Sequence, residues 1–331
     1  MNYDNAGWNK TKLLHTSYGR DIPYKNRYIQ YGHTILLCLH GFGGDKNSSV
    51  IEALDKELFT DVVALDWPAH GESRAEDDEL TVENCLKDLD SMIMMLKTEH
   101  PDNPIVCFAT SFGGYIATLY RNAHPGVFVK LILRSPALKM AETFEKLVQE
   151  EDFSRLQDGE KITLGFDRKM QIGKEFYDGL VENPVYDTPI EDPMQVMIMQ
   201  GDQDDVVDPE EICCYAEANK IRLKLFEGTD HRYKKEGELK KIIEYTDDFL
   251  SIRYSVSDEG TLYRIGRGIV VYEWDILQGK WERDEGHFAS QRYFDITGQG
   301  GNWDKYTDID EKAAWMKAKR SGGTMEEFTK G

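Results

Sequence analysis

The stretch at residues 105–117 limits the possible folds of this chain more than any other part of its sequence. It starts with an apolar run typical of a buried strand, turns at Ser111, and continues in a pattern that predicts a helix. Such a turn brings strand and helix so close that only small residues fit two positions either side of the serine, here Ala109 and Gly113. The stretch therefore has the form of a G-x-S-x-G nucleophile elbow with alanine for the first glycine, although S-x-G-G also occurs in ordinary loops.

Short apolar runs and longer helix-like segments alternate through the first 250 residues. Runs without polar alternation are typical of strands buried on both faces, as in a parallel sheet. Between them, residues 81–96 and 238–252 carry apolar side chains at helical spacing. The sequence thus predicts an α/β fold with a doubly wound, mostly parallel sheet and right-handed crossovers. The predicted strands are residues 35–39, 62–65, 105–108, 129–133, 196–199 and 223–226.

We expect residues 1–254 to form this α/β domain, with residues 137–190 inserted between two of its strands. The insertion has helix-like portions at 141–151 and 173–180, and no strand run of comparable apolarity. Because chemistry gathers at the carboxyl ends of parallel strands, an insertion there would cover the pocket as a helical lid. An ordinary long crossover is the alternative.

The pattern changes again in residues 255–331, which we expect to form a small β-rich module ending in a helix. Residues 262–265 and 269–274 have the composition of antiparallel strands, and residues 277–280 that of a turn. A D-x-x-E sequence precedes the helical pattern at 312–320. The aromatic side chains of this module would form either its core, which is the commoner use, or a ligand platform.

The charge balance argues against two classes of partner. Sixty acidic residues against 40 basic ones give a formal charge of −20, which repels nucleic acid and anionic membrane surfaces. No apolar run reaches the 18 residues or so that span a bilayer, and residues 1–8 lack the basic and apolar regions of a signal peptide.

The cysteines point to the cytoplasm. Cys38 and Cys107 lie in apolar runs, where cysteine acts as a small buried hydrophobe. Cys213 and Cys214 are adjacent, without C-x-x-C spacing. The five cysteines therefore suggest no disulfide framework and no metal site, and a reducing compartment is expected.

A serine nucleophile needs a base, a carboxylate that orients the base, and donors for the oxyanion. His231 follows the last strand run and could reach back to Ser111, although a histidine in a loop is often a surface residue. The loop at 201–209 holds four aspartates without the spacing of a calcium loop. Asp204 is our candidate for the orienting acid, with Asp205 as the alternative, because sequence alone does not set the direction of the loop.

Two backbone amides are candidates for the oxyanion hole. Phe112 stands at the N-terminus of the elbow helix, where free amides and the helix dipole favour an anion. The second donor is expected in the glycine-rich loop at 40–44, at Phe42. A phosphate-binding loop is the competing interpretation, but the stretch has neither G-x-x-x-x-G-K-[ST] nor G-x-G-x-x-G.

Five motifs in this order resemble the α/β-hydrolase superfamily, over roughly residues 28–252. The resemblance implies that Ser111, Asp204 and His231 form a catalytic triad. Within the superfamily the chain is most similar to small bacterial esterases and to the serine aminopeptidase-like or monoacylglycerol-lipase-like group. Those proteins carry a lid where residues 137–190 lie. The motifs are residues 40–44, 66–73, 109–113, 201–204 and 228–231.

The second of these motifs resembles a structural loop of the family, D-x-x-G-H-G-x-S. Ala69 replaces its first glycine. The resemblance implies that Asp66, His70 and Ser73 are elements of the fold and not catalysts. Residues 255–331 resemble no family.

These observations predict a serine hydrolase that cleaves a small-molecule carboxylic ester through an acyl-enzyme, without metal or organic cofactor. One alternative keeps the machinery but cleaves an amide at a peptide N-terminus, or a thioester. Another is a non-catalytic binding protein on the same scaffold. In a third, the C-terminal module recruits a protein partner whose identity the sequence does not give.

Overall fold

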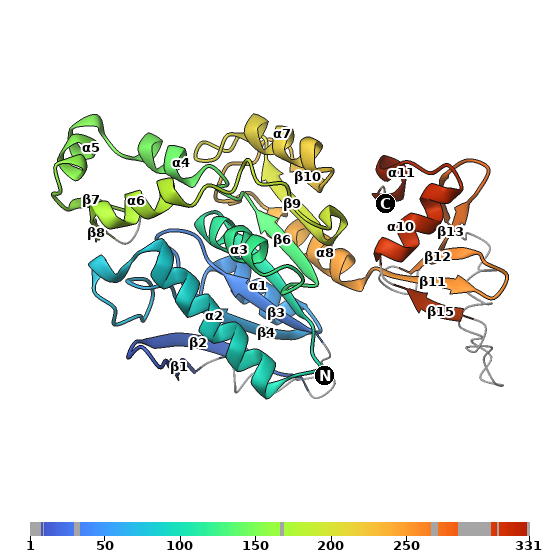
Figure 1. The fold of residues 1–331 in the computed structure, drawn as a ribbon, viewed down its shortest axis with the longest axis horizontal. Coiled ribbons are helices and arrows are strands. Elements are labelled where there is room, and N and C mark those ends of the chain that lie inside the picture. Colours follow the sequence, from blue (N-terminus) through green and yellow to red (C-terminus); the bar gives the residue numbers. More distant parts are fainter. Residues whose placement is uncertain are drawn as a thin grey trace. The chain divides into compact units, whose positions relative to one another are not determined.

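The structure is a computed structural model that describes residues 8, 10–29, 34–165, 169–265, 271–283, 306–309 and 311–329 (Figure 1). The chain divides into two compact units, of which the first contains residues 1–191 and 196–243. The second contains residues 192–195 and 244–331. Within the described residues, no helix combines the length and the apolar content needed to cross a membrane.

The first unit is built on an eight-stranded sheet with the strand order β1-β2-β4-β3-β5-β6-β9-β10. The strands from β3 onward run parallel, as predicted, whereas β1 and β2 pair antiparallel and make one edge of the sheet. The sheet is therefore mixed, because two strands that the sequence did not reveal precede the parallel ones. The bounds are β1 Lys12–His15, β2 Asp21–Arg27, β3 Ile35–Leu39, β4 Asp61–Leu65, β5 Ile105–Thr110, β6 Lys130–Arg134, β9 Val196–Gly201 and β10 Arg222–Phe226.

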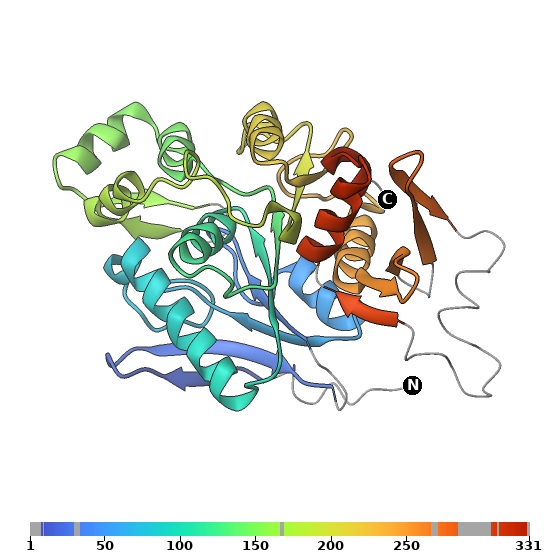
Figure 2. The same ribbon diagram turned by 45° about the vertical axis from the view of Figure 1, so that its right-hand side comes forward.

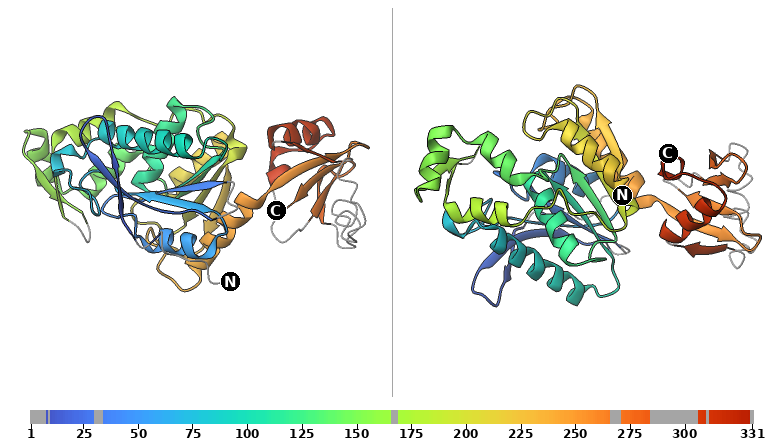
Figure 3. Two further views of the ribbon diagram at one scale, coloured as in Figure 1. Left: turned by 90° about the horizontal axis from the view of Figure 1, so that it is seen from below. Right: turned by 45° about the horizontal axis from the view of Figure 1, so that its top comes forward.

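Helices cover both faces of this sheet. Alternate residues of the central strands, such as Leu37, Cys107 and Leu131, share one buried cluster with α2 and α3. Figure 3 shows α1 on the opposite face of the sheet from α2 and α3. Thr81 caps the N-terminus of α2, since its hydroxyl accepts the N–H of Asn84. The bounds are α1 Ser49–Glu57, η1 Asp77–Glu79, α2 Val82–Glu99, α3 Phe112–Ala123, α7 Pro209–Asn219 and α8 Glu238–Ser251.

The insertion between β6 and β9 is not wholly helical. Besides the helices that the sequence predicted, it contains two short antiparallel strands, β7 and β8, which follow α5 and precede α6 in the chain (Figure 2). Strands of three residues are too short to produce an apolar run in the sequence. The bounds are α4 Met140–Leu147, α5 Glu150–Gln157, β7 Ile162–Leu164, β8 Met170–Ile172 and α6 Lys174–Glu182.

The second unit holds a five-stranded antiparallel sheet with the order β14-β13-β12-β11-β15. Tyr254, Trp274 and Phe328 are buried in one core cluster of this unit, so these aromatic side chains serve as core. Of the strand predicted at 269–274, residues 269 and 270 lie outside the described residues. The bounds are η2 Pro193–Gln195, β11 Arg253–Ser257, β12 Leu262–Ile265, β13 Val271–Asp275, β14 Lys280–Arg283, β15 Tyr306–Ile309, α10 Glu311–Arg320 and α11 Met325–Thr329.

Candidate active site

Ser111 lies on the turn between β5 and α3 in a conformation that few non-glycine residues adopt. Its φ is 51° and its ψ is −115°, and such strained positions cluster at functional sites. The turn is as tight as the sequence predicts, since a Cβ on Gly113 would lie 2.5 Å from the carbonyl oxygen of His40. The N–H of Ser111 donates to the carbonyl of Arg134 over 3.0 Å, which fixes the turn to the end of β6.

The structure brings together the three side chains that the sequence singled out. Oγ of Ser111 lies 3.1 Å from Nε2 of His231. Nδ1 of His231 lies 2.9 Å from Oδ2 and 3.0 Å from Oδ1 of Asp204. Asp205, the alternative acid, is exposed to solvent. This arrangement can pass a proton from the serine hydroxyl to an imidazole whose other nitrogen is held by a carboxylate.

The carboxylate of Asp204 is buried and well supplied with donors. Its Oδ1 accepts the backbone N–H groups of Val206 and Val207 over 3.0 and 2.8 Å. Its Oδ2 accepts Nε2 of Gln200 over 3.0 Å. Burial disfavours the charged form of Asp204, but the hydrogen bonds, led by that of His231, outweigh it and hold the pKa of the carboxyl below its ordinary value. The acid is therefore ionised at neutral pH.

Two further strained residues meet beside this carboxylate. Ser135 and Tyr233 have φ values of 43° and 52°, and their hydroxyl oxygens lie 3.3 Å apart. The guanidinium of Arg134 lies 4.9 Å from the centre of the Tyr233 ring, and burial raises the pKa of Tyr233 to about 12. Because Tyr233 follows His231 by two residues, this contact ties the histidine loop to the end of β6. Sequence reasoning missed both residues, since a positive φ at a non-glycine residue leaves no signal in the sequence.

The two residues proposed as oxyanion donors, Phe42 and Phe112, belong to segments that meet at the elbow. Phe112 is the first residue of α3, so its amide has no partner within the helix. Phe42 belongs to the loop after β3, and this loop runs against the elbow, where a Cβ on Gly41 would lie 3.1 Å from Cβ of Ser111. The rings of Phe42 and Phe112 meet edge to face, 6.2 Å apart.

Two buried histidines fix the loop after β3 through hydrogen bonds. Nε2 of His70 accepts the N–H of Gly43 over 3.0 Å, and Nε2 of His40 accepts the N–H of Trp67 over 3.2 Å. Burial lowers the pKa of His40 to about 4, so the ring is neutral and keeps its acceptor at neutral pH. His70 is thus a structural element, in agreement with the role that the motif implies.

A buried ion pair joins the same two loops. Nζ of Lys46, a fully buried side chain, lies 2.6 Å from Oδ2 of Asp66. Asp66 also accepts the backbone N–H groups of Lys46 and Glu72, each over 2.8 Å. The carboxylate therefore acts as a common acceptor for the loop after β3 and the loop after β4.

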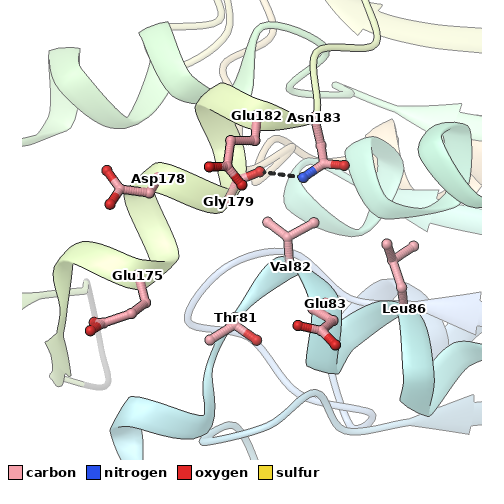
Figure 4. A pocket seen from close by; sticks show the side chains of 9 residues that line it. All are labelled: Thr81, Val82, Glu83, Leu86, Glu175, Asp178, Gly179, Glu182 and Asn183. Atoms are coloured by element: carbon pink, nitrogen blue, oxygen red, sulfur yellow. Dashed lines mark hydrogen bonds between the residues drawn. The ribbon is translucent and has the colours of Figure 1, made fainter.

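A cavity of about 560 Å³ lies in the first unit between α2 and α6 (Figure 4). Its lining includes four carboxylates but none of Ser111, His231 and Asp204. The cavity is therefore separate from the site around Ser111. The lining residues are Thr81, Val82, Glu83, Leu86, Glu175, Asp178, Gly179, Glu182 and Asn183. Among the residues that the structure describes, no group of three or more potential ligands could hold a metal ion.

The fold is shared with known proteins. A putative hydrolase from Agrobacterium vitis is similar over 73% of this chain and 99% of its own, with a TM-score of 0.64 and 17% identity. Est1E from Butyrivibrio proteoclasticus with bound ferulic acid covers 72% of this chain and 97% of its own, with a TM-score of 0.62 and 20% identity. The family model described as serine aminopeptidase, S33 matches residues 32–158. The first unit therefore has the α/β-hydrolase fold.

Further comparisons show that the known proteins with this fold are distant in sequence. The mouse α/β hydrolase domain-containing protein 10 covers 73% of the chain and 98% of its own length, with a TM-score of 0.59 and 18% identity. No curated protein matches the sequence. At such identities the solved structures establish the fold, and the chemistry has to be argued from the residues of this chain.

Proposed function

We propose that this α/β hydrolase cleaves a carboxylic ester through an acyl-enzyme intermediate. Ser111 is the nucleophile, His231 the general base and Asp204 the acid that orients it. The observation that carries the proposal is the continuous chain of contacts from Oγ of Ser111 through both ring nitrogens of His231 to the carboxylate. Nucleophile, base and orienting group within hydrogen-bonding reach are the geometric requirement of such catalysis.

In the first half of the reaction, Oγ of Ser111 attacks the ester carbonyl carbon while Nε2 of His231 takes the hydroxyl proton. The carbonyl π-bond electrons move to the oxygen, which becomes an oxyanion. The tetrahedral intermediate then expels the alcohol, which leaves with the proton that His231 returns. Asp204 stabilises the imidazolium and keeps the other imidazole proton on Nδ1.

The backbone N–H groups of Phe42 and Phe112 donate to the oxyanion. Each such donor is worth about 10²–10³ in rate, because it is fixed before charge develops. In the second half, His231 takes a proton from water, the hydroxide attacks the acyl carbon, and Ser111 leaves with the returned proton. The products are a carboxylic acid and an alcohol.

We infer that the insertion at 137–190 acts as a lid over this site. Support comes from Phe176 of α6, whose buried ring packs against the rings of Phe42 and Phe112, 5.9 and 5.8 Å away. One side chain of the insertion thus touches both residues proposed as oxyanion donors.

A second candidate is cleavage of an amide at a peptide N-terminus, which the description of the matching family model favours. Such a reaction needs a carboxylate near the nucleophile to hold the free amine. The carboxylates of α6 in the acidic cavity line a space that does not include Ser111, so the ester is the better candidate. The substrate is a small molecule, and the five free thiols agree with a cytoplasmic enzyme.

Matched substrates test the choice of bond. We expect the wild type, and not Ser111→Ala, to hydrolyse p-nitrophenyl esters whose acyl chains have about two to eight carbons. Aminoacyl p-nitroanilides serve as the amide series. Faster turnover of the anilides would overturn the ester proposal and favour the aminopeptidase, and binding of both series without turnover would favour a binding protein.

A further inference from the structure

The carboxylate of Asp204 is held on its two sides by different parts of the fold. Oδ1 accepts backbone N–H groups from Val206 and Val207, which belong to the same loop as the carboxylate. Oδ2 accepts the side-chain amide of Gln200, which lies on β9. The loop therefore fixes the position of one oxygen, and the sheet fixes the other.

Gln200 is well placed to hold Oδ2 of Asp204. The residue is fully buried, and its backbone lies in the sheet, where it stands opposite Leu225 of β10. The neighbours of its Nε2 are the carbonyls of Gly201 and Val207, at 3.2 and 3.5 Å, besides the carboxylate. All of these are acceptors, so the NH₂ end of the amide has to face them.

The orientation of this carboxylate matters because both its oxygens lie about equally far from Nδ1 of His231, at 3.0 and 2.9 Å. A rotation of the Asp204 side chain about its Cα–Cβ bond would swing the carboxylate away from the ring and lengthen both contacts. It would then hold the imidazole less well in the tautomer that presents Nε2 to Ser111. The amide of Gln200 opposes that rotation and adds a hydrogen bond to a charged acceptor.

We infer that Gln200 is a positioning residue of the hydrolase. Gln200 acts through Asp204 and touches neither substrate nor nucleophile. The inference rests on the proposed function of Ser111, His231 and Asp204. It goes beyond that function because it adds a residue from the strand, outside the motifs that carry the family resemblance.

The first test compares Gln200→Met with Gln203→Met. Methionine keeps the length of the side chain and removes the donor. We expect Gln200→Met to lower kcat on the preferred p-nitrophenyl ester by about ten- to hundred-fold, the size of a hydrogen bond to a charged group, with KM nearly unchanged. Gln203, in the same loop, is exposed and donates to the carbonyl of Asp202, so Gln203→Met should keep both constants.

A merely structural role for Gln200 would lower the melting temperature and leave kcat per folded molecule unchanged. The double variant Gln200→Met/Asp204→Asn separates the two roles. If Gln200 acts through the carboxylate, replacing Gln200 should lower kcat only slightly once Asp204 has already been replaced. If Gln200→Met lowered kcat by the same factor in the wild-type and Asp204→Asn backgrounds, the inference would be overturned.

The rate of fluorophosphonate labelling distinguishes failure of this inference from failure of the proposed function. No labelling of the folded wild type would overturn both. Labelling of the wild type with an equal rate in Gln200→Met would overturn the role of Gln200 alone. If Gln200→Met does not fold, Gln200→Leu, which also lacks the donor, takes its place with the same expected loss of labelling rate.

Discussion

The backbone N–H of Gly43 donates to Nε2 of His70 over 3.0 Å, which ties the loop after β3 to the loop after β4. Nδ1 of the same ring lies 2.8 Å from the carbonyl of Pro68, so the ring carries its proton on Nδ1 and accepts on Nε2. The ring of Phe42 meets His70 edge to face, 5.6 Å away. The stretch that carries one proposed oxyanion donor is therefore fixed by a buried imidazole.

We expect His70→Leu to lower both stability and turnover. The N–H of Gly43, which is partly buried, would lose its acceptor; this costs about 1 kcal/mol, the low end of the range for buried donors. The loop at Phe42 would also loosen, so kcat should fall more than KM rises. Urea unfolding and ester hydrolysis measure the two effects. His15→Leu, at an exposed histidine, is the control, and equal behaviour of the two variants would contradict the role of His70.

Lys46→Met should be among the most destabilising single substitutions in the first unit. It would leave the buried carboxylate of Asp66 without its cation, and breaking a buried pair in this way costs about 3–5 kcal/mol. The matched control is Lys87→Met, which removes an exposed i,i+4 pair with Glu83 and should cost no more than about 0.5 kcal/mol. Similar urea midpoints for both variants would show that the Lys46 pair is not buried as described.

Gly113→Ala tests the close approach at the elbow. The new Cβ would lie 2.5 Å from the carbonyl oxygen of His40 and 2.9 Å from that of Leu39, and backbone atoms cannot give way without moving a strand. We expect a loss of about 1–3 kcal/mol of stability and a fall in activity. Ala109→Gly, two residues before the nucleophile, should be tolerated. A fully stable Gly113→Ala would contradict the geometry of the turn.

Asp204→Asn should lower kcat by about 10⁴, because an amide cannot hold the imidazole in the required tautomer. The variant also has a signature in the pH dependence of stability. The folded pKa of Asp204 lies below its ordinary value of 3.8, so the carboxylate contributes stability above about pH 4 that is lost as the pH falls through the folded pKa. The stability difference between wild type and Asp204→Asn should therefore shrink in urea unfolding from pH 7 to pH 3. A difference that stays constant would contradict this assignment.

Much of the parallel sheet could be predicted from the sequence, because each buried strand is a continuous apolar run. All six predicted runs are strands of the sheet. The antiparallel edge could not be predicted in this way. The sequence of β2, Asp21–Arg27, contains Pro23 and three charged residues, and only its pairing with β4 makes it a strand. Tertiary contacts override local preference in such segments.

The site residues were predictable where a motif follows the end of a strand. Ser111, Asp204 and His231 meet because parallel strands place their carboxyl ends at one edge of the sheet. Gln200 was not predictable, since it ends an apolar run and gains a partner only when the loop after β9 turns back. Ser135 and Tyr233 meet through strained backbone conformations that sequence patterns do not encode.

The central claim is that Ser111 is an activated nucleophile. The most direct measurement is the intact mass of the wild type and of Ser111→Ala after exposure to a fluorophosphonate. We predict a single covalent adduct on the wild type and none on the variant. An unlabelled, folded wild type, or an adduct that persists in Ser111→Ala, would contradict the account.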